Sequence, residues 1–211
     1  MQPSDYPLEF AVEYPDRDLN RLTSAFRIFT VIPIAIVLGL LTGGGGWGGG
    51  GGEYWASLAG TGVGVLFLPT ALMILFRKKY PRWWYDWNLQ LVRFANRVGI
   101  YLLLMDDRYP STDEEQSVRL EFPYPDAETG LERGMPIVKW LLAIPHYVVL
   151  FFLDVAVFFV VIGVWFAILF TGRYPRGLFE FVEGVVRWHN RVVVYAFALT
   201  TDRYPPFRLA P

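Results

Sequence analysis

Three long apolar runs constrain the fold of this chain more than any other feature. They extend over Leu22–Leu41, Ala56–Phe76 and Ile137–Phe170. The first two have about the length of a helix that crosses a hydrocarbon core roughly 30 Å thick. The third would form a helix about 51 Å long, which is too long for one ordinary crossing. Because a charge at the bilayer centre is costly, Asp154 predicts a turn near the middle of this run.

The composition favours an integral membrane protein. Hydrophobic residues make up 54% of the chain and charged residues 18%, whereas charged residues supply about a quarter of a typical soluble domain. The net charge of −1 provides no field that would attract nucleic acid, so no nucleic-acid partner is expected. The chain has no cysteine, which excludes disulfides and thiolate metal sites.

The chain contains an internal repeat. The motif Tyr80-Pro81-Arg82 aligns with Tyr174-Pro175-Arg176, and Tyr14-Pro15-Asp16 aligns with Tyr124-Pro125-Asp126. We therefore predict two tandem membrane modules, residues 5–110 and 117–208, joined by a linker at 111–116. Each module is predicted to contain a transmembrane helical hairpin. The first has a longer connection that includes a Gly-rich loop at 43–52, and the second has a tight turn at Asp154.

A third helix is predicted to follow each hairpin, at Trp83–Met105 and Gly177–Leu199. Each carries polar residues at steps of three and four, which place them on one helix face. The polar positions are Asp86, Gln90, Arg93, Asn96 and Arg97 in the first helix, and Glu180, Glu183, Arg187, Asn190 and Arg191 in the second.

The position of these amphipathic helices in the membrane has two interpretations. They could lie in the interface, or they could span the bilayer with the stripes hidden in a bundle. If they do not span, the basic clusters fall on one side of the membrane, and the Gly-rich loop and the Asp154 turn, both free of Lys and Arg, fall on the other. This distribution favours four crossings in a multi-pass inner (plasma) membrane protein with both termini cytoplasmic. An inverted repeat with six crossings is the alternative.

Two short segments, LEFAVEY and SVRLEFPY, alternate apolar and polar residues with a period of two. This pattern predicts a short cytoplasmic strand before each hairpin. The expected fold class is therefore all-α integral membrane, with two tandem transmembrane helical hairpins, each followed by an amphipathic interfacial helix, and short cytoplasmic β-strands.

Two motifs of the second module carry a resemblance to a known family. These are Phe170-Thr171-Gly172-Arg173-Tyr174-Pro175 and Thr201-Asp202-Arg203-Tyr204-Pro205-Pro206-Phe207. They resemble a bacterial membrane family known as domain of unknown function 4389, and the resemblance covers nearly all of the second copy. The first copy departs from it, because Arg77-Lys78-Lys79 replaces Thr-Gly-Arg. The resemblance implies membrane segments and supplies no catalytic residues.

The charged stripes are the most informative polar residues, and three readings of them remain open. They could be a solvated face with intrahelical ion pairs, an anchor for anionic lipid headgroups, or a polar pathway between the modules. The motif Arg173-Tyr174-Pro175-Arg176 is expected at the membrane–water boundary, where Tyr is favoured and Pro ends a helix.

Catalysis is not expected from this sequence. It contains no catalytic motif, and neither His146 nor His189 has a second ligand at metal-binding spacing, so we expect no enzyme activity, no cofactor and no metal. The favoured function is a membrane scaffold or accessory subunit that binds anionic lipid, a protein partner or a second copy. A small channel or transporter lined by the two stripes is the alternative.

Overall fold

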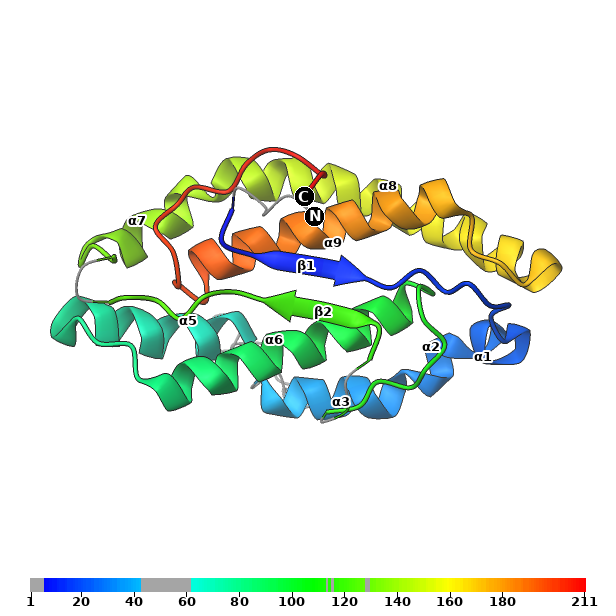
Figure 1. Ribbon diagram of the computed structural model, residues 1–211, viewed down its shortest axis with the longest axis horizontal. Helices are drawn as coiled ribbons and strands as arrows, with labels where there is room; N and C mark the ends of the chain where they lie inside the picture. Colours follow the sequence, from blue (N-terminus) through cyan, green and yellow to red (C-terminus); the bar gives the residue numbers. More distant parts are fainter. Residues whose placement is uncertain (1–5, 43–61, 113, 115, 128–129) are drawn as a thin grey trace, which may run out of the picture.

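The computed structural model describes residues 6–42, 62–112, 114, 116–127 and 130–211, and the Gly-rich loop at 43–52 lies outside them. The described chain is mostly helical and includes a sheet of two strands (Figure 1). The elements, in chain order, are β1 (Glu9–Val12), α1 (Arg21–Ala25), α2 (Arg27–Thr30), α3 (Ile32–Leu41), α5 (Gly62–Leu72), the π-helix η1 (Met73–Arg77), α6 (Arg82–Leu102), β2 (Val118–Glu121), α7 (Met135–Leu142), α8 (Ile144–Thr171) and α9 (Arg176–Ala196).

The long helices run along the longest axis of the molecule (Figure 1). Helices α8 and α9 lie side by side, β1 and β2 occupy the centre, and α6 follows with α3 packed against it. The strands pair antiparallel, with Phe10 opposite Leu120. Both residues are buried, and their neighbours Glu9 and Glu121 are exposed, as the period of two predicts. The predicted short strands are therefore confirmed.

Each strand packs on a helix from the other half of the chain. Strand β1 contacts α9, and β2 contacts α6. Both helices are 21 residues long and begin directly after a Tyr-Pro pair, at Pro81 and Pro175. Proline has no backbone N–H to leave unsatisfied, which suits it to the start of a helix. The two predicted amphipathic helices are thus present, each within a few residues of the expected bounds.

The predicted turn at Asp154 is wrong, because α8 is one continuous helix of 28 residues. No Gly or Pro lies between Pro145 and Gly163 to interrupt it. The Asp154 carboxylate is half-exposed at the contact with α9, where its Oδ2 lies 3.3 Å from His189 Nε2. Since the carboxylate is half-exposed and has a partner at the edge of the helix, no turn is needed to avoid burying the charge.

Within the described residues, α8 is the one helix long and apolar enough to cross a membrane. The segments Arg27–Leu41 and Phe67–Arg77 are apolar but shorter. The structure therefore supports one candidate span, where the sequence predicts four crossings in two hairpins.

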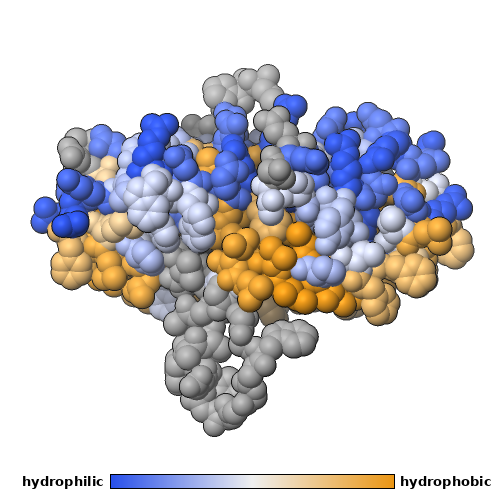
Figure 2. Space-filling view, turned by 90° about the horizontal axis from the view of Figure 1, so that it is seen from below, coloured by the Kyte–Doolittle hydropathy of each residue, from blue (hydrophilic) through white to orange (hydrophobic). Residues whose placement is uncertain are grey.

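Most of α8 is exposed. Its buried apolar residues Leu150, Val157, Val164 and Ile168 form one stripe toward the core. Large apolar side chains on the rest of α8, and on α3 and α7, are exposed, and we call them together the apolar surface. It comprises Ile32, Ile36, Val37, Leu40, Leu41, Ile137, Val138, Trp140, Leu141, Leu142, Ile144, Val148, Val149, Phe151, Phe152, Val155, Phe158, Phe159, Ile162, Phe166 and Phe170. On the face seen from below, apolar residues form a band along one half of the molecule, and hydrophilic residues line the other half (Figure 2).

Candidate functional site

Most of the polar stripe on α9, which we call the α9 stripe, faces the interior. Arg187 is buried and uses three nitrogens: Nε donates to Phe10 O at 3.2 Å, Nη1 to Leu209 O at 3.0 Å, and Nη2 to Glu183 Oε1 at 2.6 Å. One turn later, Arg191 donates to the carbonyl oxygens of Arg208 and Ala210 at 2.8 and 2.7 Å. The two guanidinium groups therefore hold β1 and the C-terminal segment against α9.

The polar stripe on α6, which we call the α6 stripe, donates hydrogen bonds to backbone carbonyls in a similar way. Arg93 Nε donates to Leu120 O of β2 at 2.9 Å, and its Nη2 lies 3.7 Å from Glu121 Oε1. Arg97 is buried and donates to Ser111 O at 2.9 Å. The acidic residue that begins this stripe, Asp86, is exposed.

The two stripes meet at a pair of asparagines. Asn96 Nδ2 donates to Asn190 Oδ1 at 2.8 Å, and Asn190 Nδ2 donates to Asn96 Oδ1 at 2.7 Å. Reciprocal hydrogen bonds between side-chain amides satisfy the polar atoms of both asparagines and fix the two helices in register. At the outer end of the α9 stripe, Glu180 is exposed and pairs loosely with Arg176 at 3.8 Å.

Burial changes the electrostatics of the α9 stripe. It disfavours the charged form of Arg191 and lowers the pKa of this group to about 10, with smaller contributions from the nearby positive charges of Arg208 and Arg187. Arg191 nevertheless stays protonated at neutral pH. The reading in which the stripes face water is therefore wrong for Arg97, Arg187 and Arg191, whose charges are inside the fold.

The motif Arg173-Tyr174-Pro175-Arg176 forms the corner between α8 and α9. Gly172 ends α8 at a φ of +75°, a conformation that glycine adopts without strain. Tyr14 OH donates to Tyr174 O at 2.6 Å, and Arg173 Nε lies 3.0 Å from Asp18 Oδ1. This corner is therefore closed by the segment that follows β1.

Two buried cations that the sequence analysis did not single out hold the ends of the amphipathic helices. Lys139 Nζ donates to Thr201 O at 2.7 Å, lies 2.6 Å from Asp202 Oδ1 and stands over the Tyr195 ring. Burial lowers the pKa of Lys139, and Asp202 opposes this shift. Arg27 donates to the carbonyls of Tyr101 and Asp106 and stands over the Tyr101 ring. Their signal in the sequence is a single positive charge inside an apolar run, at the same offset as the aligned Ile32-Pro33 and Ile144-Pro145.

His146 serves packing in this structure. It is buried, its Nδ1 accepts a hydrogen bond from Trp188 Nε1 at 3.0 Å, and its ring stacks on Phe207 with a centroid distance of 4.0 Å. The described part of the chain contains no group of three or more His, Cys, Asp or Glu side chains arranged to hold a metal ion.

Comparison with known proteins gives one match. A model of the family described as Domain of unknown function (DUF4389) matches residues 136–208, which include α8, α9 and the motif at 173–176. No curated protein and no solved structure matches the chain. The chain is thus similar to this family over roughly a third of its length, and no residue role comes with the match.

Proposed function

We propose that this protein is a non-catalytic membrane scaffold whose apolar surface lies in the lipid of one leaflet and whose polar half faces the cytoplasm. The observation that carries the proposal is the exposure of large side chains along α8, where Phe152, Phe159 and Phe170 are 67%, 66% and 78% exposed. A contiguous apolar patch of this kind marks an interaction surface, and in water it would favour aggregation.

The arrangement of polar and apolar residues supports an orientation in the plane of the membrane. The apolar band and the polar half lie beside each other along the whole length of the molecule (Figure 2), and α8 runs along that same length (Figure 1). If α8 crossed the bilayer, α9 beside it would cross too, with Arg176 and Glu180 exposed on it. A helix that lies along the interface avoids the cost of placing these two charges in lipid.

Contacts at aligned positions support two modules related by a pseudo-twofold axis. Phe10 and Leu120, which the repeat aligns, pair in the sheet, and each accepts a hydrogen bond from the Arg of the opposite module. Tyr14 OH donates to Tyr174 O, and its aligned partner Tyr124 donates to Tyr80 O. Tyr6 OH lies 3.3 Å from Arg203 O, which favours placing both ends of the described chain on one, cytoplasmic side.

A channel or transporter lined by the stripes is the weaker alternative. Arg187 already donates from Nε, Nη1 and Nη2 to protein groups, so these donors would have to break bonds to serve a permeating ion. A scaffold that binds lipid through its apolar surface, and a protein partner or second copy through its polar half, needs no such rearrangement.

Depth measurements test the proposal, because the chain has no native cysteine. Single cysteines at Val148, Phe159 and Phe170 lie about three turns apart on nearly the same face of α8. Each would carry a fluorophore in phosphatidylcholine bilayers that contain lipid-borne quenchers at known depths, with Arg119 on the exposed side of β2 as the aqueous control. Similar depths at the three α8 sites are expected.

Two results would contradict this proposal. A deep central site between two shallow ends would mean that α8 crosses the bilayer. Access of an aqueous quencher to all three sites in the presence of lipid would exclude membrane embedding. Ion flux through the reconstituted wild-type protein would favour the transporter instead.

A further inference from the structure

The guanidinium group of Arg27 has an edge without a partner. Arg27 is 2% exposed, and its Nη1 donates to Tyr101 O at 2.8 Å and to Asp106 O. Its Nε and Nη2, which lie along one edge of the planar group, are buried and have no hydrogen-bond partner among the described residues. Such an edge can bind a carboxylate through two parallel hydrogen bonds. Because a buried donor without an acceptor is costly, a carboxylate that can reach this edge would be bound there.

The second module shows which group binds the equivalent cation. Lys139 aligns with Arg27 in the repeat, and its Nζ lies 2.6 Å from Asp202 Oδ1. The other oxygen of this carboxylate, Oδ2, accepts a hydrogen bond from Glu132 N at 2.9 Å. One aspartate therefore pairs with the buried cation and, at the same time, holds the backbone that precedes α7.

The first module contains the aligned aspartate, Asp107, but uses it differently. Asp107 Oδ2 accepts a hydrogen bond at 3.3 Å from Asn20 N, which aligns with the Glu132 N of the second module. Asp107 Oδ1, however, pairs with Arg17 Nη2. The corresponding segment of the second module, residues 124–132, contains no Lys or Arg that could compete in this way. Two arginines of the first module thus compete for one carboxylate oxygen.

We propose that Asp107 is a switch with two positions, paired with Arg17 in this structure and with the Nε–Nη2 edge of Arg27 in a second state. The second state needs a change of the Asp107 side-chain rotamer, and Oδ2 can keep its hydrogen bond to Asn20 N, as the aligned contact of the second module does. Burial lowers the pKa of Arg27, and Tyr101, Asp107 and Asp106 oppose this shift, which means that the Asp107 charge acts on Arg27. The switch does not depend on the proposed function, because it concerns contacts within the chain.

Salt distinguishes the two positions of Asp107. The Arg17 side chain is 53% exposed, so its ion pair with Asp107 is screened by dissolved salt. Arg27 is buried, and an ion pair with its guanidinium is screened much less. Rising ionic strength therefore moves Asp107 inward, and Arg17 keeps the more distant Asp106 Oδ1 at 3.6 Å. The inward state leaves Arg17 more available to an anion from solution, so anion binding at the surface and the inner ion pair favour each other.

The Nε–H group of Arg27 reports on the switch. Its exchange with water is measured by NMR on the full-length protein in detergent micelles, and Arg27→Lys identifies its signal by the loss of that signal. Arg17→Gln removes the surface partner of Asp107. Arg173→Gln is the matched control, because it removes the exposed partner of Asp18 in the same connection between β1 and α1.

In Arg17→Gln, the Arg27 Nε proton is expected to exchange with water at least about tenfold more slowly, the factor that one charge-assisted hydrogen bond contributes. Adding Asp107→Asn should remove most of this protection, because a neutral amide binds a guanidinium more weakly than a carboxylate does. The control Arg173→Gln should leave the exchange unchanged.

Salt titration of the wild-type protein gives a second measurement that needs no substitution. The Arg27 Nε proton should exchange more slowly as salt is added, relative to the Nε proton of Arg191. Arg191 Nε is the internal reference, because it is also buried without a hydrogen-bond partner in the described part of the chain.

Three results would overturn the switch. One is equally fast exchange of the Arg27 Nε proton in the wild-type protein and in Arg17→Gln, together with no response to salt. Another is slow exchange that persists in Arg17→Gln/Asp107→Asn, since the acceptor would then be a different group, such as a water molecule. The third is equal slowing in Arg173→Gln, which would indicate a general effect on the segment before α1.

Discussion

Replacing Arg187 by Met tests whether the α9 stripe holds the fold together. The Arg187 side chain is 10% exposed and that of its partner Glu183 is 15% exposed. The substitution would remove the three hydrogen bonds of the guanidinium and leave the Glu183 carboxylate with the backbone N–H of Val12 at 3.2 Å. Removing one partner of a buried ion pair costs about 3–5 kcal/mol of unfolding free energy.

The equivalent substitution on α6, Arg93→Met, should lower the free energy of unfolding much less. Arg93 makes one hydrogen bond to Leu120 O, and its side chain is 26% exposed. Its acidic neighbour Glu121 is 73% exposed, so this ion pair is weak. We expect Arg93→Met to lower the free energy of unfolding by about 1 kcal/mol.

Reversible unfolding by denaturant in detergent micelles would measure both variants against the wild-type protein. We expect Arg187→Met to be the less stable variant by about 2–4 kcal/mol, and Glu183→Leu/Arg187→Met to recover part of the loss, because it no longer leaves a charge unpaired. The reasoning is refuted if Arg187→Met unfolds within about 1 kcal/mol of the wild-type protein or is the more stable of the two single variants.

Three further predictions concern other parts of the fold. Burial raises the pKa of Tyr80 to about 12. The stability that this group contributes is therefore complete below pH 10 and falls by about 2–3 kcal/mol as the pH rises to 12. Tyr80→Phe should flatten the pH dependence of the unfolding midpoint in this range. Asp154→Pro should destabilise the protein by about 3 kcal/mol or more in the same unfolding measurement, because Asp154 is inside a continuous helix; an unchanged stability would indicate the turn that the sequence predicts. Gly184→Ala should free the C-terminal segment for proteolysis, because a Cβ there would lie 2.9 Å from Leu209 Cβ, whereas Gly99→Ala on α6 meets nothing within 4 Å and should leave proteolysis unchanged.

The parts of the fold that local patterns encode could be predicted. The period of two in β1 and β2, the Tyr-Pro pairs before α6 and α9, and the polar steps of three and four on both helices are all present in the structure as expected. These patterns are sufficient because the residues that set each element are within the element or next to it. The modules themselves remain a prediction, supported by the contacts at aligned positions.

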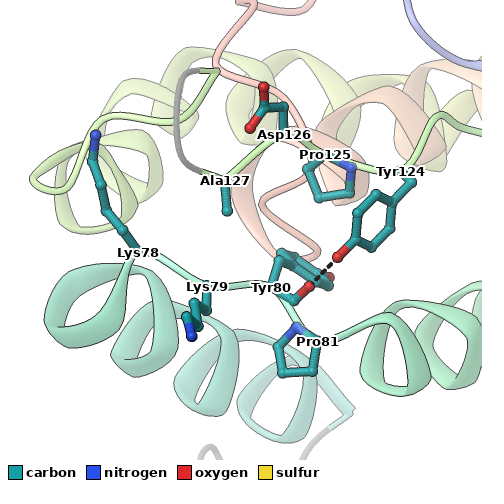
Figure 3. A pocket seen from close by; sticks show the side chains of 8 residues that line it. All are labelled: Lys78, Lys79, Tyr80, Pro81, Tyr124, Pro125, Asp126 and Ala127. Atoms are coloured by element: carbon teal, nitrogen blue, oxygen red, sulfur yellow. Dashed lines mark hydrogen bonds between the residues drawn. The ribbon is translucent and has the colours of Figure 1, made fainter.

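The interior could not be predicted in the same way. The partners of the α9 stripe are backbone carbonyls such as Phe10 O and Leu209 O, and a carbonyl has no sequence signature. The prediction of a turn at Asp154 is wrong because it assumes a charge at the bilayer centre. The Asp154 carboxylate is instead half-exposed and paired with His189. The pocket between residues 78–81 and residues 124–127 (Figure 3) depends on how two distant Tyr-Pro segments meet, which also has no local signal.

The pairing of β1 with β2 has a consequence for how the chain is made. Strand β1 leaves the ribosome long before β2 and α9, on which it packs, have been synthesised. Until then β1 has neither β2 nor α9 to pack on, and the apolar helices of the first half are synthesised before both of these partners. We therefore expect chains truncated before α9 to leave β1 without this packing partner, and to be degraded in cells faster than the full-length chain.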